Sequence, residues 1–119
     1  MTPEEVVRSF IAAHKRLDVD AIVDAFTPDG VWHNMPYQPA NGRDEIRKIA
    51  EDFFSRTAAA DLQLINVAVN GNVVLVERID HIDYAGREIH APCMGAFEIE
   101  GDKIKAWRDY FDSAGHSSE

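Results

Sequence analysis

Cysteine is nearly absent from this chain of 119 residues, in which Cys93 is the single example. One cysteine cannot form an intrachain disulfide or build a thiolate metal cluster, so a reducing compartment, the cytoplasm, is the expected location. Basic residues are also scarce, with 12 Lys and Arg against 21 Asp and Glu and a formal net charge of −9. Such a surface repels a phosphate backbone and an anionic bilayer, which argues against nucleic-acid and membrane partners.

Long apolar runs are missing too. No stretch approaches the roughly 20 apolar residues that a membrane-spanning helix needs. The first residues also lack the basic and apolar regions of a secretory signal, so neither secretion nor membrane insertion is expected. The length suits a single domain with one core, which we predict over residues 1–112, and residues 113–119 are predicted to be a flexible tail.

Helical patterns dominate the first half of the sequence. Thr2 can cap a helix that is predicted to continue to about Leu17, since a proline and a capping-box glutamate follow the threonine. Asp18 can cap a second helix, with residues 27–30 as the turn that ends it. A third helix after Gly42 carries apolar residues at helical spacing: Ile46, Ile49, Ala50, Phe53 and Phe54.

Strand patterns dominate the second half. A short strand is predicted over residues 31–35, and from Leu62 onward the apolar period becomes two. Three dipeptides suited to tight hairpin turns divide this region: Asn70-Gly71, Ala85-Gly86 and Gly101-Asp102. Helices followed by consecutive hairpins predict an α+β domain whose three helices pack on one face of a curved sheet that encloses a pocket.

Charged side chains interrupt the apolar faces of the predicted strands. Alternation places Arg78 and Asp80 on the face of Val74, Val76 and Ile82. It also aligns Asp109 with Trp107 and Phe111, and Asn34 with Trp32. A lone buried charge costs several kcal/mol, so these groups suit a core only if they pair within one cavity.

Simpler interpretations stay open at this point. Arg and Asp two residues apart on a strand more often form a solvated ion pair, and Asp109 could be an exposed carboxylate at a strand end. The two tryptophans could be core residues, Asn34 a turn former before Met35-Pro36, and Cys93 a small core or pocket residue. The sequence shows no metal-ligand spacing, so neither a metal nor an organic cofactor is expected.

Four segments together resemble the limonene-1,2-epoxide hydrolase family, within the SnoaL-like and nuclear-transport-factor-like superfamily. They are Trp32-His33-Asn34-Met35-Pro36, Gly42-Arg43-Asp44, Glu77-Arg78-Ile79-Asp80 and Trp107-Arg108-Asp109-Tyr110-Phe111-Asp112. The resemblance covers nearly the whole chain and implies a cone-shaped α+β barrel with a deep pocket, frequently a homodimer. It assigns Arg78 and Asp80 to the catalytic Arg-x-Asp pair, Asp109 to the second catalytic aspartate, and Asn34 to the water-holding asparagine.

The resemblance implies a cofactor-free hydrolase that adds water to a small cyclic or terpenoid-like epoxide, with Asp109 as base and Asp80 as acid. The sequence departs from the family at Trp32, where a tyrosine that holds the water is usual, and an indole N–H can donate but not accept. Residues expected to line the pocket are Met35, Tyr37, Phe53, Val76, Ile82, Ala91, Cys93, Trp107 and Phe111. The alternatives are an isomerase or cyclase of the same fold, of ketosteroid-isomerase or polyketide-cyclase type, and a non-catalytic domain that binds a small ligand.

Overall fold

The computed structural model describes residues 1–112; the predicted tail, residues 113–119, lies outside the described part. The described chain forms three helices and six strands. In order they are α1 (Pro3–Lys15), α2 (Val19–Asp24), β1 (Phe26–Met35), β2 (Ala40–Asn41), α3 (Gly42–Ser55), β3 (Thr57–Asn70), β4 (Val73–Tyr84), β5 (Arg87–Glu100) and β6 (Lys103–Phe111). The predicted α+β class, with all three helices in the first half, is confirmed. None of these helices has the length and apolar character that crossing a bilayer requires.

The strands form one mixed sheet in the order β2-β1-β6-β5-β4-β3. All neighbours are antiparallel except β1 and β6, which are parallel. The three predicted hairpins join β3 to β4, β4 to β5 and β5 to β6. The turns at Ala85-Gly86 and Gly101-Asp102 lie as predicted, whereas the first turn is formed by Gly71 and Asn72 because Asn70 still pairs with Val73. In the second turn Ala85 and Gly86 have φ values of 52° and 81°, and positive φ at both positions lets a tight turn match the twist of its strands.

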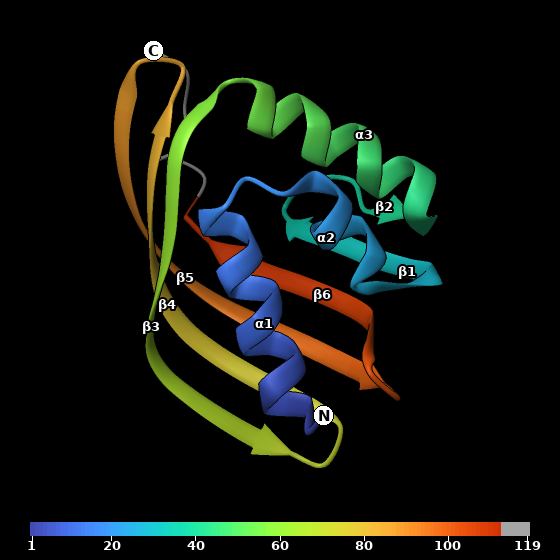
Figure 1. The fold of residues 1–119 in the computed structure, drawn as a ribbon. Helices are drawn as coiled ribbons and strands as arrows, with labels where there is room; N and C mark the ends of the chain where they lie inside the picture. The colour runs from blue at the N-terminus through green and yellow to red at the C-terminus, as the bar shows by residue number, and fades with distance from the viewer. Residues whose placement is uncertain (113–119) are drawn as a thin grey trace.

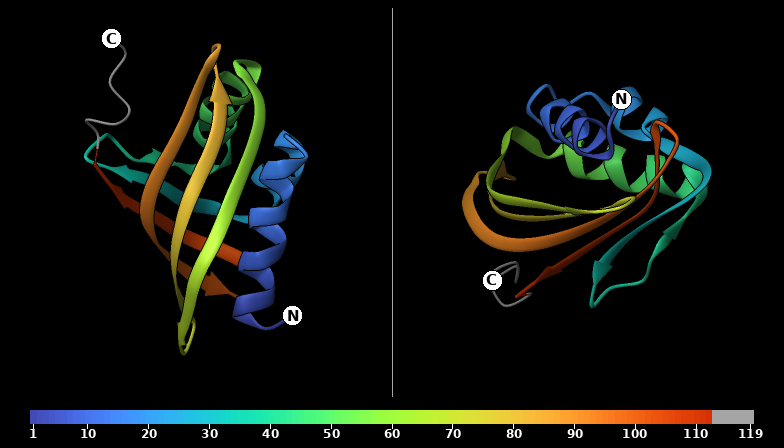
Figure 2. Two further views of the ribbon diagram at one scale, coloured as in Figure 1. Left: turned by 90° about the vertical axis from the view of Figure 1, so that its left-hand side faces the viewer. Right: turned by 90° about the horizontal axis from the view of Figure 1, so that it is seen from below.

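The sheet curls around the three helices without closing into a barrel (Figures 1 and 2). Helix α1 begins with the predicted capping box, in which the backbone N–H of Glu5 donates to Thr2 Oγ1 at 3.2 Å and that of Thr2 donates to Glu5 Oε1 at 2.8 Å. Side chains from all three helices and the concave face of the sheet form the core, which includes Phe10, Ile22, Phe97 and Trp107. The helix ends at Lys15, two residues before the predicted end, because Leu17 adopts a left-handed conformation with φ 53°.

The predicted turn at residues 27–30 is wrong, since β1 already begins at Phe26. The pairing of β1 with β6 is irregular between Phe26 and Val31, as in a bulged strand. Pro28 has no N–H to donate, and it is tolerated here because β2 pairs only with Val31 and Trp32 farther along. Strand β3 likewise begins at Thr57, earlier than the predicted Leu62.

Candidate active site

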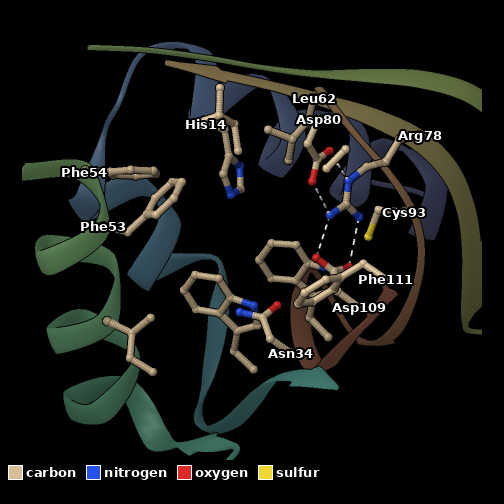
Figure 3. Close-up of a pocket in the computed structure, with 15 residues that line it drawn as sticks. His14, Asn34, Phe53, Phe54, Leu62, Arg78, Asp80, Cys93, Asp109 and Phe111 are labelled. Carbon is tan, nitrogen blue, oxygen red and sulfur yellow. Dashed lines mark hydrogen bonds and ion pairs between the residues drawn. The ribbon is translucent and has the colours of Figure 1, made fainter. Parts of the chain in front are cut away.

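Three strands bring the predicted charged residues together. Strand β5 lies between β4, which carries Arg78 and Asp80, and β6, which carries Asp109. In the register of these strands Gly95 of β5 stands directly beside Asp109. The guanidinium of Arg78 reaches past Gly95 to the carboxylate on β6, so residues 31 positions apart in sequence meet on the concave face of the sheet (Figure 3).

A single guanidinium holds both carboxylates. Arg78 donates to Asp80 from Nε at 2.7 Å and from Nη2 at 3.0 Å. It donates to Asp109 from Nη1 at 2.9 Å and from Nη2 at 2.5 Å. The side chains of Arg78, Asp80 and Asp109 are only 1 %, 14 % and 7 % exposed, so the interpretation as a solvated ion pair is wrong.

Burial and pairing act in opposite directions on these charges. Burial alone would lower the pKa of Arg78, but the adjoining carboxylates of Asp109 and Asp80 raise it above its ordinary value. Burial raises the pKa of Asp109, and Arg78 offsets only part of that effect. Two carboxylates and one guanidinium leave one negative charge uncompensated, so a single proton on the pair neutralises the site.

Asn34 and Trp32 flank this group from β1. The parallel register pairs Asn34 with Asp109 and Trp32 with Trp107. The two indole rings stack with centroids 4.9 Å apart and planes 9° apart. The indole N–H of Trp32 is buried and has no hydrogen-bond partner among the described residues. Arg78 lies against the second indole, with Cζ 5.6 Å from the Trp107 ring centroid, within the range of a cation–π contact.

The ion-paired group forms one wall of a cavity of about 150 Å³. Six of the residues predicted for the pocket line it: Phe53, Ile82, Ala91, Cys93, Trp107 and Phe111. Asn34, Trp32, Arg78, Asp80 and Asp109 line it as well. A cavity of about this volume in another protein binds benzene, so a small ring compound fits the space.

Three residues predicted for the pocket lie outside its lining. Val76 is fully buried in the core, because its position on β4 is covered by the helices. Met35 and Tyr37 lie where β1 ends, and Tyr37 is 53 % exposed, with its ring beside Phe111 rather than in the cavity.

Sequence reasoning missed four residues of the cavity wall: His14, Ile49, Phe54 and Leu62. The signal for Ile49 and Phe54 was present, because both share the apolar face of α3 with Phe53. His14 follows Val7 and Ile11 at steps of four and three residues, which places it on a buried face of α1. That spacing could have identified His14 as an inward-facing polar residue.

Cys93 is a poor nucleophile in this setting. Burial, together with the negative charge of Asp109, raises the pKa of its thiol to about 12, so the thiol is protonated at neutral pH. The sulfur and the carboxylates of Asp80 and Asp109 lie within 4.8 Å of one another. Both carboxylates already bind the cationic side chain of Arg78, which compensates part of the negative charge that would attract a metal ion.

The sequence matches the model of the limonene-1,2-epoxide hydrolase catalytic domain over residues 1–116. The chain belongs to this family. One relative is the epoxide hydrolase EphG of Mycobacterium tuberculosis. It is 26 % identical to this chain over 106 residues, which cover 89 % of this chain and 70 % of EphG. The resemblance predicted from four short segments is thereby confirmed.

Solved structures show how widely the fold of this epoxide hydrolase family is shared. A limonene-epoxide-hydrolase-like enzyme from M. tuberculosis superposes with a TM-score of 0.83 at 24 % identity, covering 93 % of this chain and 83 % of the other. A protein described as a polyketide cyclase from Pseudomonas putida superposes with a TM-score of 0.89 at 20 % identity, covering 98 % and 96 %. At these identities the structures establish the SnoaL-like fold, while the family match carries the functional argument.

Proposed function

We propose that this protein hydrolyses a small cyclic epoxide to a vicinal diol by direct attack of water. The observation that carries the proposal is the buried guanidinium of Arg78, which holds Asp80 and Asp109 at the wall of one cavity. Epoxide opening needs one group that accepts a proton from water and another that donates a proton to the ring oxygen. Two carboxyl groups in opposite protonation states supply both.

Asp109 is the proposed base. Its burial raises its pKa, which makes the carboxylate a stronger proton acceptor than an exposed aspartate. Asn34 is its partner in the register between β1 and β6, and both residues line the cavity. A water that accepts from or donates to the Asn34 amide can therefore donate its proton to Asp109 and attack an epoxide carbon. Trp32 was predicted to hold the same water; we retain this as a proposal, in which its buried indole N–H, without a hydrogen-bond partner among the described residues, is the donor.

Asp80 is the proposed acid. It carries the one proton that neutralises the carboxylate charge that Arg78 does not compensate. In a single step the water oxygen bonds to carbon, the carbon–oxygen bond of the epoxide breaks, Asp109 gains a proton, and Asp80 gives its proton to the ring oxygen. The product is the diol, and exchange with solvent returns the proton from Asp109 to Asp80. No metal or organic cofactor takes part in this scheme.

Arg78 also weighs against the isomerase and cyclase alternatives. An enolising aspartate acts best where no cation lowers its basicity, whereas here both carboxylates bind the same guanidinium. A domain that only binds a ligand does not need two carboxylates on one guanidinium. Stability does not explain the group either, because a buried ion triad often contributes little net stability.

Oxygen-18 water tests the proposal. With enzyme in excess over cyclohexene oxide, direct attack places one heavy oxygen in the diol during the first turnover, whereas a covalent ester would deliver unlabelled oxygen from a carboxylate. Asp109→Asn should lower kcat by about 10²-fold or more, since general base catalysis contributes about 10²–10⁴-fold. Asp83→Asn, an exposed carboxylate on the same strand as Asp80, is the matched control and should retain wild-type activity. Unlabelled product, or full activity in Asp109→Asn, contradicts the mechanism.

We also propose that the protein forms a homodimer through the outer face of the sheet. Met94 and Tyr110 are cross-strand neighbours on β5 and β6 and are 47 % and 48 % exposed. With the nearby Ile79 of β4 they form a patch that a second copy of the chain could bury.

A further inference from the structure

One polar residue of the cavity has no part in the proposed hydrolysis. His14 of α1 is 4 % exposed and lines the cavity from the helix side (Figure 3). In the figure its imidazole extends into the space between Phe54 and Leu62. The ring makes edge contacts with Phe10, Phe54 and Trp107, at centroid distances of 4.9, 5.9 and 5.6 Å. These three aromatic rings fix its orientation.

The hydrogen bonding of His14 defines which ring nitrogen carries the proton. Nδ1 lies 3.0 Å from the backbone carbonyl oxygen of Phe10, which can only accept, so Nδ1 is the donor. Burial lowers the pKa of His14 to about 4, so the imidazole is neutral and has a single N–H. Nε2 is therefore a hydrogen-bond acceptor, and no side chain or backbone group in residues 1–112 donates to it.

We propose that His14 Nε2 accepts a hydrogen bond from a hydroxyl group of the substrate, so that the preferred substrate is a small apolar epoxide bearing one hydroxyl away from the epoxide ring. This inference rests on the proposed function, because it names the class of epoxide that the same cavity takes. An acceptor left unpaired in an apolar site costs free energy, and a hydroxyl on the ligand removes that cost.

The surroundings of His14 select a neutral donor. A carbonyl or ether oxygen offers only lone pairs, which Nε2 cannot bind. An anionic ligand would lose its hydration in this cavity, where the group of Arg78, Asp80 and Asp109, with one proton on the two carboxyls, offers no net positive charge to compensate it. The remaining wall near His14 is apolar, with Phe53, Phe54 and Leu62, and suits the hydrocarbon part of the substrate.

A pair of matched substrates tests the subsite. The first is cyclohexene oxide with a hydroxyl on a ring carbon away from the epoxide, and the second carries a methyl group at that carbon. A neutral hydrogen bond predicts that wild-type kcat/KM favours the hydroxylated compound by roughly 5- to 10-fold. His14→Leu should reduce the ratio to about one, and His14→Gln, which keeps an acceptor, should restore part of it. Lys15→Gln, an exposed neighbour on α1, should keep the wild-type ratio.

Binding of unreactive probes separates the two proposals. Cyclohexanol, but not methylcyclohexane, should shift the ¹⁵N resonance of His14 Nε2 in labelled protein, and this readout requires no turnover. If neither epoxide is hydrolysed but cyclohexanol gives the shift, the proposed function fails and the subsite stands. If both epoxides are hydrolysed at equal rates and His14→Leu leaves the ratio unchanged, the subsite is overturned and the hydrolase function stands.

Discussion

Gly95 is the residue that allows Arg78 to reach Asp109, and replacing it by alanine should disrupt that pair. A Cβ at this position would lie 2.7 Å from Arg78 Nη1 and 2.8 Å from Asp109 Oδ1, the two atoms that share a 2.9 Å hydrogen bond. Ordinary contacts of a Cβ are about 3.4 Å or longer, so at least one partner must move by more than half an ångström. Loss of a hydrogen bond between charged groups costs about 1.5–3 kcal/mol. Gly95→Ala should therefore lower kcat/KM for epoxide hydrolysis by roughly 10- to 100-fold.

The pH profile distinguishes this effect from a general loss of structure. Arg78 lowers the pKa of Asp109, so weakening their contact raises that pKa further. A base must be ionised, and the acidic limb of the kcat/KM profile should therefore move to higher pH in Gly95→Ala. Gly30→Ala is the matched control, because its Cβ would be similarly crowded, 3.0 Å from Phe26 Cδ1 and 3.1 Å from the carbonyl oxygen of Ile104, but away from the cavity. It should lower stability without moving the limb. A Gly95→Ala enzyme with wild-type kcat/KM and an unshifted limb would refute the reasoning.

Three further predictions concern stability, assembly and reactivity. The pKa of His14 is about 4 in the folded chain and about 6.5 unfolded, so as pH falls from 6.5 to 4 only the unfolded state gains this proton. The free energy of unfolding should fall by about 3 kcal/mol more in wild type than in His14→Leu over that range, as urea titration at both pH values would measure; equal losses would contradict a neutral buried histidine. Met94→Glu should convert the proposed dimer to monomers in light scattering, whereas Glu77→Gln on the same face of β4 should not. Cys93 should resist iodoacetamide at neutral pH and react once the protein is unfolded in urea, and fast labelling of the native protein would contradict the raised pKa of its thiol.

The sequence was sufficient to predict the class of the fold because local chemistry determines most of its elements. The capping box at Thr2 and the turns at Ala85-Gly86 and Gly101-Asp102 lie as predicted, because each of these residue patterns strongly favours one local conformation. The first hairpin also forms, but its turn residues are Gly71 and Asn72, one position later than the predicted Asn70-Gly71. The start of β1 was mistaken for a turn because Pro28 and Gly30 normally end elements. Only the long-range pairing of β1 with β6 shows that the same residues form an irregular strand.

The site was predictable only in part, for a similar reason. Alternation along single strands identified Arg78, Asp80 and Asp109 as inward-facing, but it could not show that β5 lies between β4 and β6 or that a glycine opens the path across it. The family resemblance, and not the periodicity, predicted that these three side chains meet in one site. His14 is not part of the four segments that resemble the family. Its proposed role depends on which ring nitrogen donates to a backbone carbonyl of its own helix, and only the folded structure shows this.

Several apolar side chains of helix α3 line the cavity and remain partly exposed instead of packing into the core. Of the apolar residues predicted at helical spacing on this helix, only Ile46 and Ala50 are buried, while Ile49 is 40 % exposed and Phe53 and Phe54 are partly exposed. Fully burying a side chain of this size contributes about 1.5–3 kcal/mol, so with 40 % or less of each side chain exposed the three residues leave about 1–3 kcal/mol of apolar burial unrealised in the free protein. A ring compound between α3 and the Arg78 group would recover part of that free energy. The same aromatic side chains that weaken the packing of the free protein thereby become the source of affinity for an apolar epoxide.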